Sequence, residues 1–346
     1  MTDKKRINLA LQGGGAHGAF AWGVLEHLLD DGRLSVDGIC ATSAGTMNAV
    51  CFAHGLAHGG PDQAKATLTK FWRRVATIGQ RYSGRAPWDT WPWAFPLLEN
   101  LRYIAFESAT RVVSPYQFNP FGINPLRDLL DDLVDFETLR DAPAVKLFIS
   151  TTKVRTGRAR VFHTDEISLD VAMASACLPY LFKAVEIGGD YYWDGGYTGN
   201  PALFPLHYHT DTQDLLIVHF NPIERDSVPT TADAISDRIN EISFNSSLLH
   251  ELRSIAFVQE LIDQDMLKDD ARDRFKYLYV HALRADRALS EYSIASKFAA
   301  DWGFFTHLRD KGRAAMAQWL RDNFAALGER STVDLHQGVL LSAENR

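Results

Sequence analysis

Basic residues are in deficit in this chain, and long hydrophobic runs are absent. The 346 residues include 36 Lys and Arg against 43 Asp and Glu, which gives a formal net charge of −7. Proteins that bind nucleic acids take much of their affinity from clustered cations on phosphates, so this charge balance argues against a nucleic-acid partner. No stretch reaches the roughly 18 apolar residues that span a bilayer, so we expect no transmembrane helix.

Cysteine is scarce as well. Cys40, Cys51 and Cys177 form an odd set without CxxC or metal-ligand spacing. We therefore expect reduced thiols in the core of a cytoplasmic protein. The first residues, MTDKKRINLALQ, pass from basic side chains into a strand-like run that is too short for a secretory signal.

Apolar runs alternate with segments of helical periodicity from the N-terminus onward. Residues 7–12 and 36–42 are typical of buried strands, and helical spacing follows each of them, over residues 17–30 and from 43 to about 57. This order predicts an α/β fold with a largely parallel sheet, whose functional groups lie on the turns after the strands. Further strand-like runs occupy residues 145–154, 159–163, 215–221 and 277–283.

Long segments with helical periodicity dominate the chain after residue 230. The sequence has no internal repeat and no composition shift that is typical of a linker. We therefore expect residues 1–230 to form a core and residues 231–346 to form a helical elaboration packed on it, within one structural domain.

A glycine loop follows the first predicted strand, in the stretch LALQGGGAHGAF. Residues 13–18 match G-x-G-x-x-G, the pattern that binds dinucleotide pyrophosphates between a strand and a helix. That use requires an acid at the end of the second strand, where it reaches the ribose, but Asp37 stands near the start of its strand. A dinucleotide-binding oxidoreductase is therefore the weaker alternative for this chain.

Ser43 stands at the end of the second strand, within ATSAG. A serine on a sharp turn between a strand and a helix is a nucleophile elbow, whose hydroxyl projects above the sheet. Ala41 takes the place of the usual first glycine, which is tolerable inside a strand. An ordinary N-cap serine is the structural alternative. If the two strands are neighbours, backbone N–H groups of Gly14, Gly15 and Ala44 surround an oxyanion beside Ser43.

A serine nucleophile needs a proton acceptor, and Asp194 is the strongest candidate. It ends a short aromatic strand and precedes Gly195 and Gly196, although an isolated Asp-Gly pair is also typical of a plain turn. A Ser-Asp-His triad of the α/β-hydrolase type is the mechanistic alternative, but an elbow directly after the second strand fits that fold badly. That triad would draw its histidine from His207, His209, His219, His250, His281 and His307.

Four motifs stand in a distinctive order along the chain: GGGAHG at 13–18, TSAG at 42–45, ASACLPYLF at 174–182 and DGGY at 194–197. Together they resemble the patatin-like phospholipase family. The resemblance implies a three-layer α/β/α sandwich around a mostly parallel sheet, without a metal or another cofactor. It also implies a Ser-Asp catalytic dyad, with Ser43 as nucleophile and Asp194 as base. The oxyanion hole is then formed by Gly13, Gly14, Gly15 and Ala44.

Members of that family hydrolyse acyl esters of phospholipids, lysophospholipids or neutral lipids. The resemblance thus predicts a serine lipid acyl hydrolase that cleaves carboxylic esters, and a catalytically silent lipid-binding protein of the same fold is the alternative. His17 departs from the Arg or Lys that the family often has in the glycine loop. Capping of the helix start is the favoured interpretation of His17, and orientation of a polar group of the substrate is the alternative. Headgroup, chain length, acyl transfer and oligomeric state are not determined by the sequence.

A basic segment followed by an aromatic segment indicates how the protein contacts a lipid surface. Residues 63–88 include six Lys and Arg and no acid, and PWDTWPWAFPLL comes next. Cations attract anionic headgroups and tryptophan prefers the headgroup boundary, so we predict a lid or a transient contact with a membrane surface. A packed flap with solvated charges is the alternative. The candidate contact residues are Trp88, Trp91, Trp93 and Phe95.

Overall fold

The computed structural model describes residues 4–82, 113–225, 227–268, 275–289, 292, 294–335 and 341–342. In this part of the chain an eight-stranded sheet has the order β5-β6-β3-β2-β1-β7-β8, and β4 pairs with β3. Its strands are β1 (Lys5–Leu11), β2 (Leu34–Ala41), β3 (Lys146–Lys153), β4 (Arg158–His163), β5 (Val185–Ile187), β6 (Asp190–Asp194), β7 (Asp214–His219) and β8 (Tyr279–Arg284). A separate pair joins β9 (Val333–Asp334) to β10 (Leu341–Ser342).

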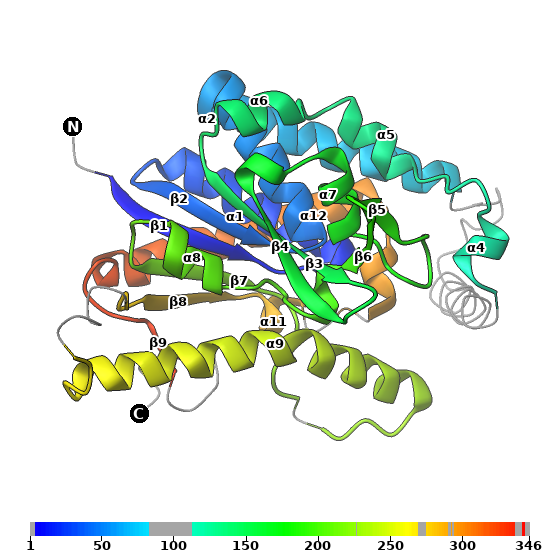
Figure 1. Ribbon diagram of the computed structural model, residues 1–346. Coiled ribbons are helices and arrows are strands. Elements are labelled where there is room, and N and C mark those ends of the chain that lie inside the picture. Colours follow the sequence, from blue (N-terminus) through cyan, green and yellow to red (C-terminus); the bar gives the residue numbers. More distant parts are fainter. Residues whose placement is uncertain are drawn as a thin grey trace.

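Helices cover both faces of this sheet, and Figure 1 shows α2 and α9 on opposite sides of it. The helices are α1 (Gly18–Asp31), α2 (Ala44–Tyr82), α4 (Pro115–Phe118), α5 (Pro125–Asp131), α6 (Phe136–Asp141), α7 (Leu169–Ser175), α8 (Phe204–His209), α9 (Ala232–Asp263), α11 (Asp286–Leu289) and α12 (Trp302–Asn323). The short 3-10 turns are η1 (Gly15–His17), η2 (Thr164–Glu166), η3 (Gly195–Tyr197), η4 (Ile294–Phe298) and η5 (Phe324–Ala326). The predicted three-layer α/β/α sandwich is confirmed.

The central strands are parallel, so their carboxyl ends share one edge of the sheet. β1 pairs in parallel with β2 and β7, β2 with β3, and β7 with β8. β6 is antiparallel to β3 and brings Asp194 level with Thr151, near the end of β3. The loops after β1, β2, β6 and β7 therefore meet at this carboxyl edge, where functional groups of α/β proteins collect.

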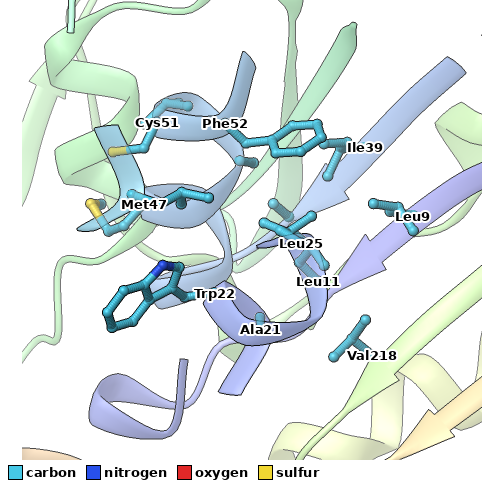
Figure 2. Packing of buried hydrophobic residues seen from close by; sticks show 14 of the residues in the cluster. Leu9, Leu11, Ala21, Trp22, Leu25, Ile39, Met47, Cys51, Phe52 and Val218 are labelled. Carbon is cyan, nitrogen blue, oxygen red and sulfur yellow. The ribbon is translucent and has the colours of Figure 1, made fainter. Parts of the chain in front are cut away.

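The core has one part on each side of the sheet, because the central strands are buried on both faces. Leu9 and Leu11 of β1 belong to the larger cluster with α1 and α2, whereas Ala10 between them belongs to the smaller cluster with α8 and α9. Figure 2 shows the larger cluster, in which Leu25 of α1 and Phe52 of α2 lie beside side chains of β1 and β2.

Two helix boundaries follow the local signals in the sequence. Gly32 ends α1 in the left-handed conformation, with φ of 69°, as a C-terminal glycine commonly does. α2 loses helical geometry at Gly59 and Gly60 and resumes at Pro61, which is favoured in a first helical turn. The helix predicted to end near residue 57 is thus followed by a second helical stretch that carries the basic residues.

The C-terminal third of the chain contributes to the main layers. β8 extends the sheet beside β7, and α12 packs closely on α1. A Cβ atom added at Gly23 would lie 1.9 Å from the Arg309 carbonyl oxygen, and one added at Gly312 would lie 2.0 Å from the Phe20 carbonyl oxygen. The two helices therefore cross with their backbones in contact. No helix in the described ranges has both the length and the apolarity needed to cross a bilayer.

We predict that Gly23→Ala lowers the free energy of unfolding by ~1–3 kcal/mol, because the added methyl group forces α1 and α12 apart. Helix propensity alone would raise the free energy of unfolding of the alanine variant by about 1 kcal/mol. A decrease therefore shows that the close contact between α1 and α12 outweighs helix propensity. Urea unfolding measures it. Gly303→Ala is the control, since its Cβ would meet only a carboxylate oxygen of Asp301, at 3.1 Å. Equal stability of Gly23→Ala and the parent chain would contradict the prediction.

Candidate active site

Ser43 occupies the turn between β2 and α2 at the carboxyl edge. Its φ is +55°, in the left-handed region that residues other than glycine rarely adopt. An N-cap serine has an extended backbone, so Ser43 has the conformation of a nucleophile elbow instead. The turn is tight because a Cβ atom at Gly45 would lie 2.3 Å from the Leu11 carbonyl oxygen. Only glycine at position 45 allows this approach of α2 to the end of β1.

Ser175 at the end of α7 holds the backbone of the elbow. The Ser43 N–H donates to Ser175 Oγ at 3.0 Å. The Ser175 hydroxyl donates to the Ser150 carbonyl oxygen at 2.8 Å, so at 2.8 Å from Thr46 Oγ1 it accepts the Thr46 proton. The ASACLPYLF segment was one of the four sequence motifs, but Ser175 was not predicted to contact the elbow, because a serine in an apolar helix carries no motif for that role.

Asp194 is buried beside the elbow, with 1% of its surface exposed. Its Oδ1 accepts the Gly196 N–H at 2.7 Å, whereas Oδ2 makes no hydrogen bond of regular geometry in the described part of the chain. Burial raises the pKa of Asp194 to about 6, and the Gly196 N–H and the Ser43 side chain oppose this rise. Its backbone is fixed as well, since the Asp194 N–H donates to the Cys177 carbonyl oxygen at 2.8 Å.

The glycine loop lies directly against Ser43. A Cβ atom at Gly13 would lie 2.8 Å from the Ser43 Cβ. The Gly13 N–H already donates to Asn200 Oδ1 at 2.7 Å, so this predicted oxyanion donor is occupied in the structure. Within the described ranges, the N–H groups of Gly14, Gly15 and Ala44 donate to no other residue, which leaves three of the four predicted donors available. Gly15 and Ala44 thus carry open N–H groups at the starts of η1 and α2.

Fully buried polar side chains cross-link the loops of the carboxyl edge. Gln12 Nε2 donates to the Asn200 carbonyl oxygen at 3.2 Å, and Gln12 Oε1 accepts the Phe220 N–H at 2.9 Å. The Thr42 hydroxyl donates to the Gly199 carbonyl oxygen at 2.7 Å. The glycine loop, the elbow, the loop after Asp194 and the end of β7 are therefore held in one network. The sequence analysis missed Gln12, Thr42 and Asn200, because none of them belongs to a recognisable catalytic pattern.

His17 joins the glycine loop to the C-terminal part of the chain. It is buried, its Nε2 lies 2.7 Å from Ser296 Oγ, and its ring packs against Tyr292 and Phe304. Burial, together with the charge of Lys297, lowers the pKa of His17 to about 3. The ring is therefore neutral near pH 7 and contacts η4 and its neighbours. Its side chain makes no cap hydrogen bond at the start of α1, where capping was the favoured interpretation.

The residues needed by the alternative mechanisms lie elsewhere. Asp37, the candidate ribose ligand, pairs with Arg6 at 3.0 Å and Lys146 at 3.4 Å near the amino ends of the strands. His281 lies 2.9 Å from Asp214 at the beginning of β7. In the described ranges no histidine hydrogen-bonds to Ser43 or Asp194, and no group of three His, Cys, Asp or Glu could hold a metal ion.

The four aromatic candidates for a lid or membrane contact, Trp88, Trp91, Trp93 and Phe95, lie outside the described residues. Part of the basic segment before them is described. Lys65 pairs with Asp30 at 2.8 Å, and Arg74 pairs with Asp132 at 2.8 Å. These two cations therefore contribute to contacts on the surface of the fold.

The fold is an α/β/α sandwich whose serine-bearing turn, glycine loop and buried acid meet at the carboxyl edge of parallel strands. The chain belongs to the patatin-like phospholipase family, because the family model matches residues 9–207, more than half of its length. No curated protein matches the chain. The matched range includes the glycine loop, Ser43 and Asp194.

Solved structures similar to this chain include VipD and ExoU. VipD from Legionella pneumophila is 14% identical with a TM-score of 0.44, and the match covers 92% of this chain and 67% of VipD. The type III effector ExoU is 15% identical with a TM-score of 0.36, over 92% of this chain and 53% of ExoU. In the ExoU–SpcU complex from Pseudomonas aeruginosa the match has 18% identity and a TM-score of 0.32. It covers 93% of this chain and 61% of the matched chain. The chain thus spans from about half to two thirds of these proteins.

We predict that Ser175→Ala lowers the free energy of unfolding by about 1–3 kcal/mol, because it leaves buried donors and an acceptor around the elbow without partners. The partners affected are the Ser43 N–H, the Thr46 hydroxyl and the Ser150 carbonyl oxygen. Urea unfolding measures the change, with Ser246→Ala on the exposed face of α9 as the matched control. If the two variants were equally stable, the network would not hold the elbow.

Proposed function

We propose that this chain is a serine lipid acyl hydrolase that cleaves carboxylic esters of phospholipids, lysophospholipids or related acyl lipids. One observation carries the proposal: the strained turn at Ser43 lies beside a buried aspartate whose pKa is raised to about 6 and whose carboxylate interacts with the Ser43 side chain. Membership of the patatin-like phospholipase family supports the lipid substrate class.

The proposed reaction has an acylation and a deacylation step. Ser43 Oγ attacks the ester carbonyl carbon while Asp194 Oδ2 accepts the hydroxyl proton. Collapse of the tetrahedral intermediate breaks the bond to the alcohol, which takes the proton back from Asp194. Water then attacks the acyl-Ser43 ester, Asp194 accepts a proton from that water, and the fatty acid leaves as the Ser43 hydroxyl is restored. No metal or cofactor takes part in these steps.

The pKa of Asp194 suits this role. A carboxylate with an ordinary pKa near 3.9 is a poor acceptor for a serine proton. Burial destabilises its charged form, so proton transfer to Asp194 costs less free energy than it would for an exposed aspartate. The acid must still be ionised before the attack begins, which is the case above about pH 6.

The negative charge that develops on the carbonyl oxygen needs preorganised donors. We assign this role to the N–H groups of Gly14, Gly15 and Ala44, with the positive end of α2 behind them. Gly13 lies against Ser43 but is not assigned as an oxyanion donor, because its N–H already donates to Asn200 Oδ1. Gly13 keeps the space beside the nucleophile free of a side chain.

We further propose that the protein is cytoplasmic and meets lipid through a surface beside the site. Tyr116, Phe118 and Phe121 around α4 are 57%, 47% and 88% exposed. This segment contacts the chain after α7, since Lys183 Nζ donates to the Pro120 carbonyl oxygen at 2.6 Å. Tyr180 in that chain lies near enough to Tyr197, beside Asp194, for the two to interact electrostatically. Exposed aromatic side chains and a lysine are suited to a headgroup boundary.

Ser43→Ala and Asp194→Asn should each reduce ester hydrolysis by at least about 10³-fold, as removal of a nucleophile or its base does in other serine hydrolases. Hydrolysis of a lysophospholipid and labelling by a fluorophosphonate are the measurements. Circular dichroism verifies that both variants fold, and labelling should be lost in Ser43→Ala. Full activity in either folded variant would refute the dyad.

The pH dependence of kcat/KM should follow the ionisation of Asp194. Because its pKa is about 6 and only the carboxylate accepts a proton, kcat/KM should fall about tenfold per pH unit below pH 6 and level off above it. Initial rates between pH 4.5 and 8 on a soluble short-chain ester test this without interference from vesicles. An acid limb centred near pH 4 would contradict the raised pKa.

The double variant Phe118→Ala, Phe121→Ala should bind vesicles several-fold more weakly, because it removes two apolar contacts with the lipid boundary. Sedimentation with vesicles of mixed phosphatidylcholine and phosphatidylglycerol measures binding, and Trp91→Ala, Trp93→Ala tests the predicted aromatic segment in the same way. The control is Met266→Ala, near the far end of α9, where the side chain is 63% exposed. Unchanged vesicle binding in both double variants would contradict the proposed lipid-binding surface.

A further inference from the structure

A cavity lies between α8 and α9, on the sheet face opposite α1 and α2. Its volume is about 380 Å³, within the range of small-molecule sites. Ser43, Asp194 and the glycine loop do not line it. The walls are mostly apolar and come from α8, from one face of α9 and from the chain that leads into β8. They include Leu203, Phe204, Ile255, Val258 and Phe275.

Glu251 places a carboxylate in this apolar cavity. Its Oε2 accepts the N–H groups of Leu203 and Phe204, both at 2.8 Å. In the part of the chain that the structure describes, no Lys, Arg or His forms an ion pair with Glu251. Burial raises the pKa of Glu251 to about 7, and the two N–H groups oppose this rise. Among the described residues, a charge on Glu251 is therefore without a counter-ion, and this part of the cavity is complementary to a cation.

Aromatic side chains gather around the same cavity. Phe204, Tyr208 and Phe275 line it, and they are 47%, 66% and 37% exposed. Aromatic faces attract alkylated ammonium groups, whose methyl or methylene groups also contact apolar walls. A carboxylate combined with aromatic rings is thus the chemistry that recognises an ammonium head on an apolar chain.

Glu251 shares the cavity with other titratable groups. Lys276 lines the cavity, but its ammonium donates to the Thr210 carbonyl oxygen. Burial lowers the pKa of Lys276, and the charges of Asp211 and Asp37 oppose this change. His207 of α8 lines the cavity as well. Beneath Glu251, the thiol of Cys40 is buried in β2 and its pKa is raised by burial, so it carries no charge.

We propose that this cavity binds an amphiphile with an alkylated ammonium head and an apolar chain. The head lies against the Glu251 carboxylate and the rings of Tyr208 and Phe275, and the chain lies along Ile255 and Val258. The site is separate from the catalytic edge, so its occupation does not depend on the proposed hydrolysis.

A structural role for Glu251, as the partner of the first N–H groups of α8, is the alternative. Glu251→Gln distinguishes the two roles, because a glutamine oxygen accepts the same N–H groups but carries no charge. A capping role alone predicts that this variant binds ligands as the parent does. The proposed role predicts that it folds normally and loses affinity for the cation.

Isothermal titration with dodecyltrimethylammonium, below its micelle concentration, tests the site in full-length Ser43→Ala protein, where hydrolysis cannot interfere. We expect saturable binding at one site, at least tenfold weaker in Glu251→Gln, while circular dichroism shows the same fold in both proteins. Dodecanoate has a similar chain and an anionic head, so it should bind at least tenfold more weakly. Affinity for the cation should rise between pH 6 and 8, as Glu251 loses its proton.

A second variant keeps the test independent of the fold of Glu251→Gln. Tyr208→Leu preserves an apolar wall but removes an aromatic face, so the affinity for dodecyltrimethylammonium should fall several-fold while a neutral dodecyl glycoside is unaffected. Equal binding by the parent and Glu251→Gln would overturn the proposal. Tighter binding of dodecanoate than of the cation would also overturn the proposal, because it would show that the Lys276 ammonium, and not the Glu251 carboxylate, determines which head group binds.

Discussion

The close approach of the elbow to the end of β1 is the constraint on which the rest of the site depends. Gly45 lets α2 start against the Leu11 carbonyl oxygen, and Gly13 lets the glycine loop lie against the Ser43 Cβ. A methyl group at either position would occupy space that the neighbouring chain already fills. Because parallel strands end at one edge, this contact brings the glycine loop beside the serine.

Keeping Ser43 at positive φ costs of order 1–3 kcal/mol, and the surrounding contacts must offset that strain. Ser175 accepts the N–H of Ser43, and Thr42 is bound to the loop that follows Asp194. Asp194 is held by its backbone N–H and by Gly196, so one carboxylate oxygen remains open. The same rigidity that compensates the strain therefore positions the two groups that we propose for proton transfer.

Residues from the C-terminal third of the chain also contact the loops at the carboxyl edge of the sheet. Lys297 Nζ donates to Asn221 Oδ1 at 2.7 Å, and its carbonyl oxygen lies against Gly15. His17 reaches Ser296, and α12 packs on α1 just after the glycine loop. Since β8 and α12 belong to the main layers, the elements after residue 230 support the loop that we propose to bind the oxyanion.

The sequence by itself determined the parallel α/β start, the glycine loop, the serine turn and the position of Asp194, because each depends on local backbone chemistry: apolar runs, small residues and the spacing of turns. It could not identify Gln12, Ser175 or Asn200, whose roles exist only when loops far apart in the chain share one edge. It could not show that Gly13 has its N–H occupied. Only the tertiary structure decided these points, because hydrogen-bond partners and burial depend on residues more than a hundred positions apart.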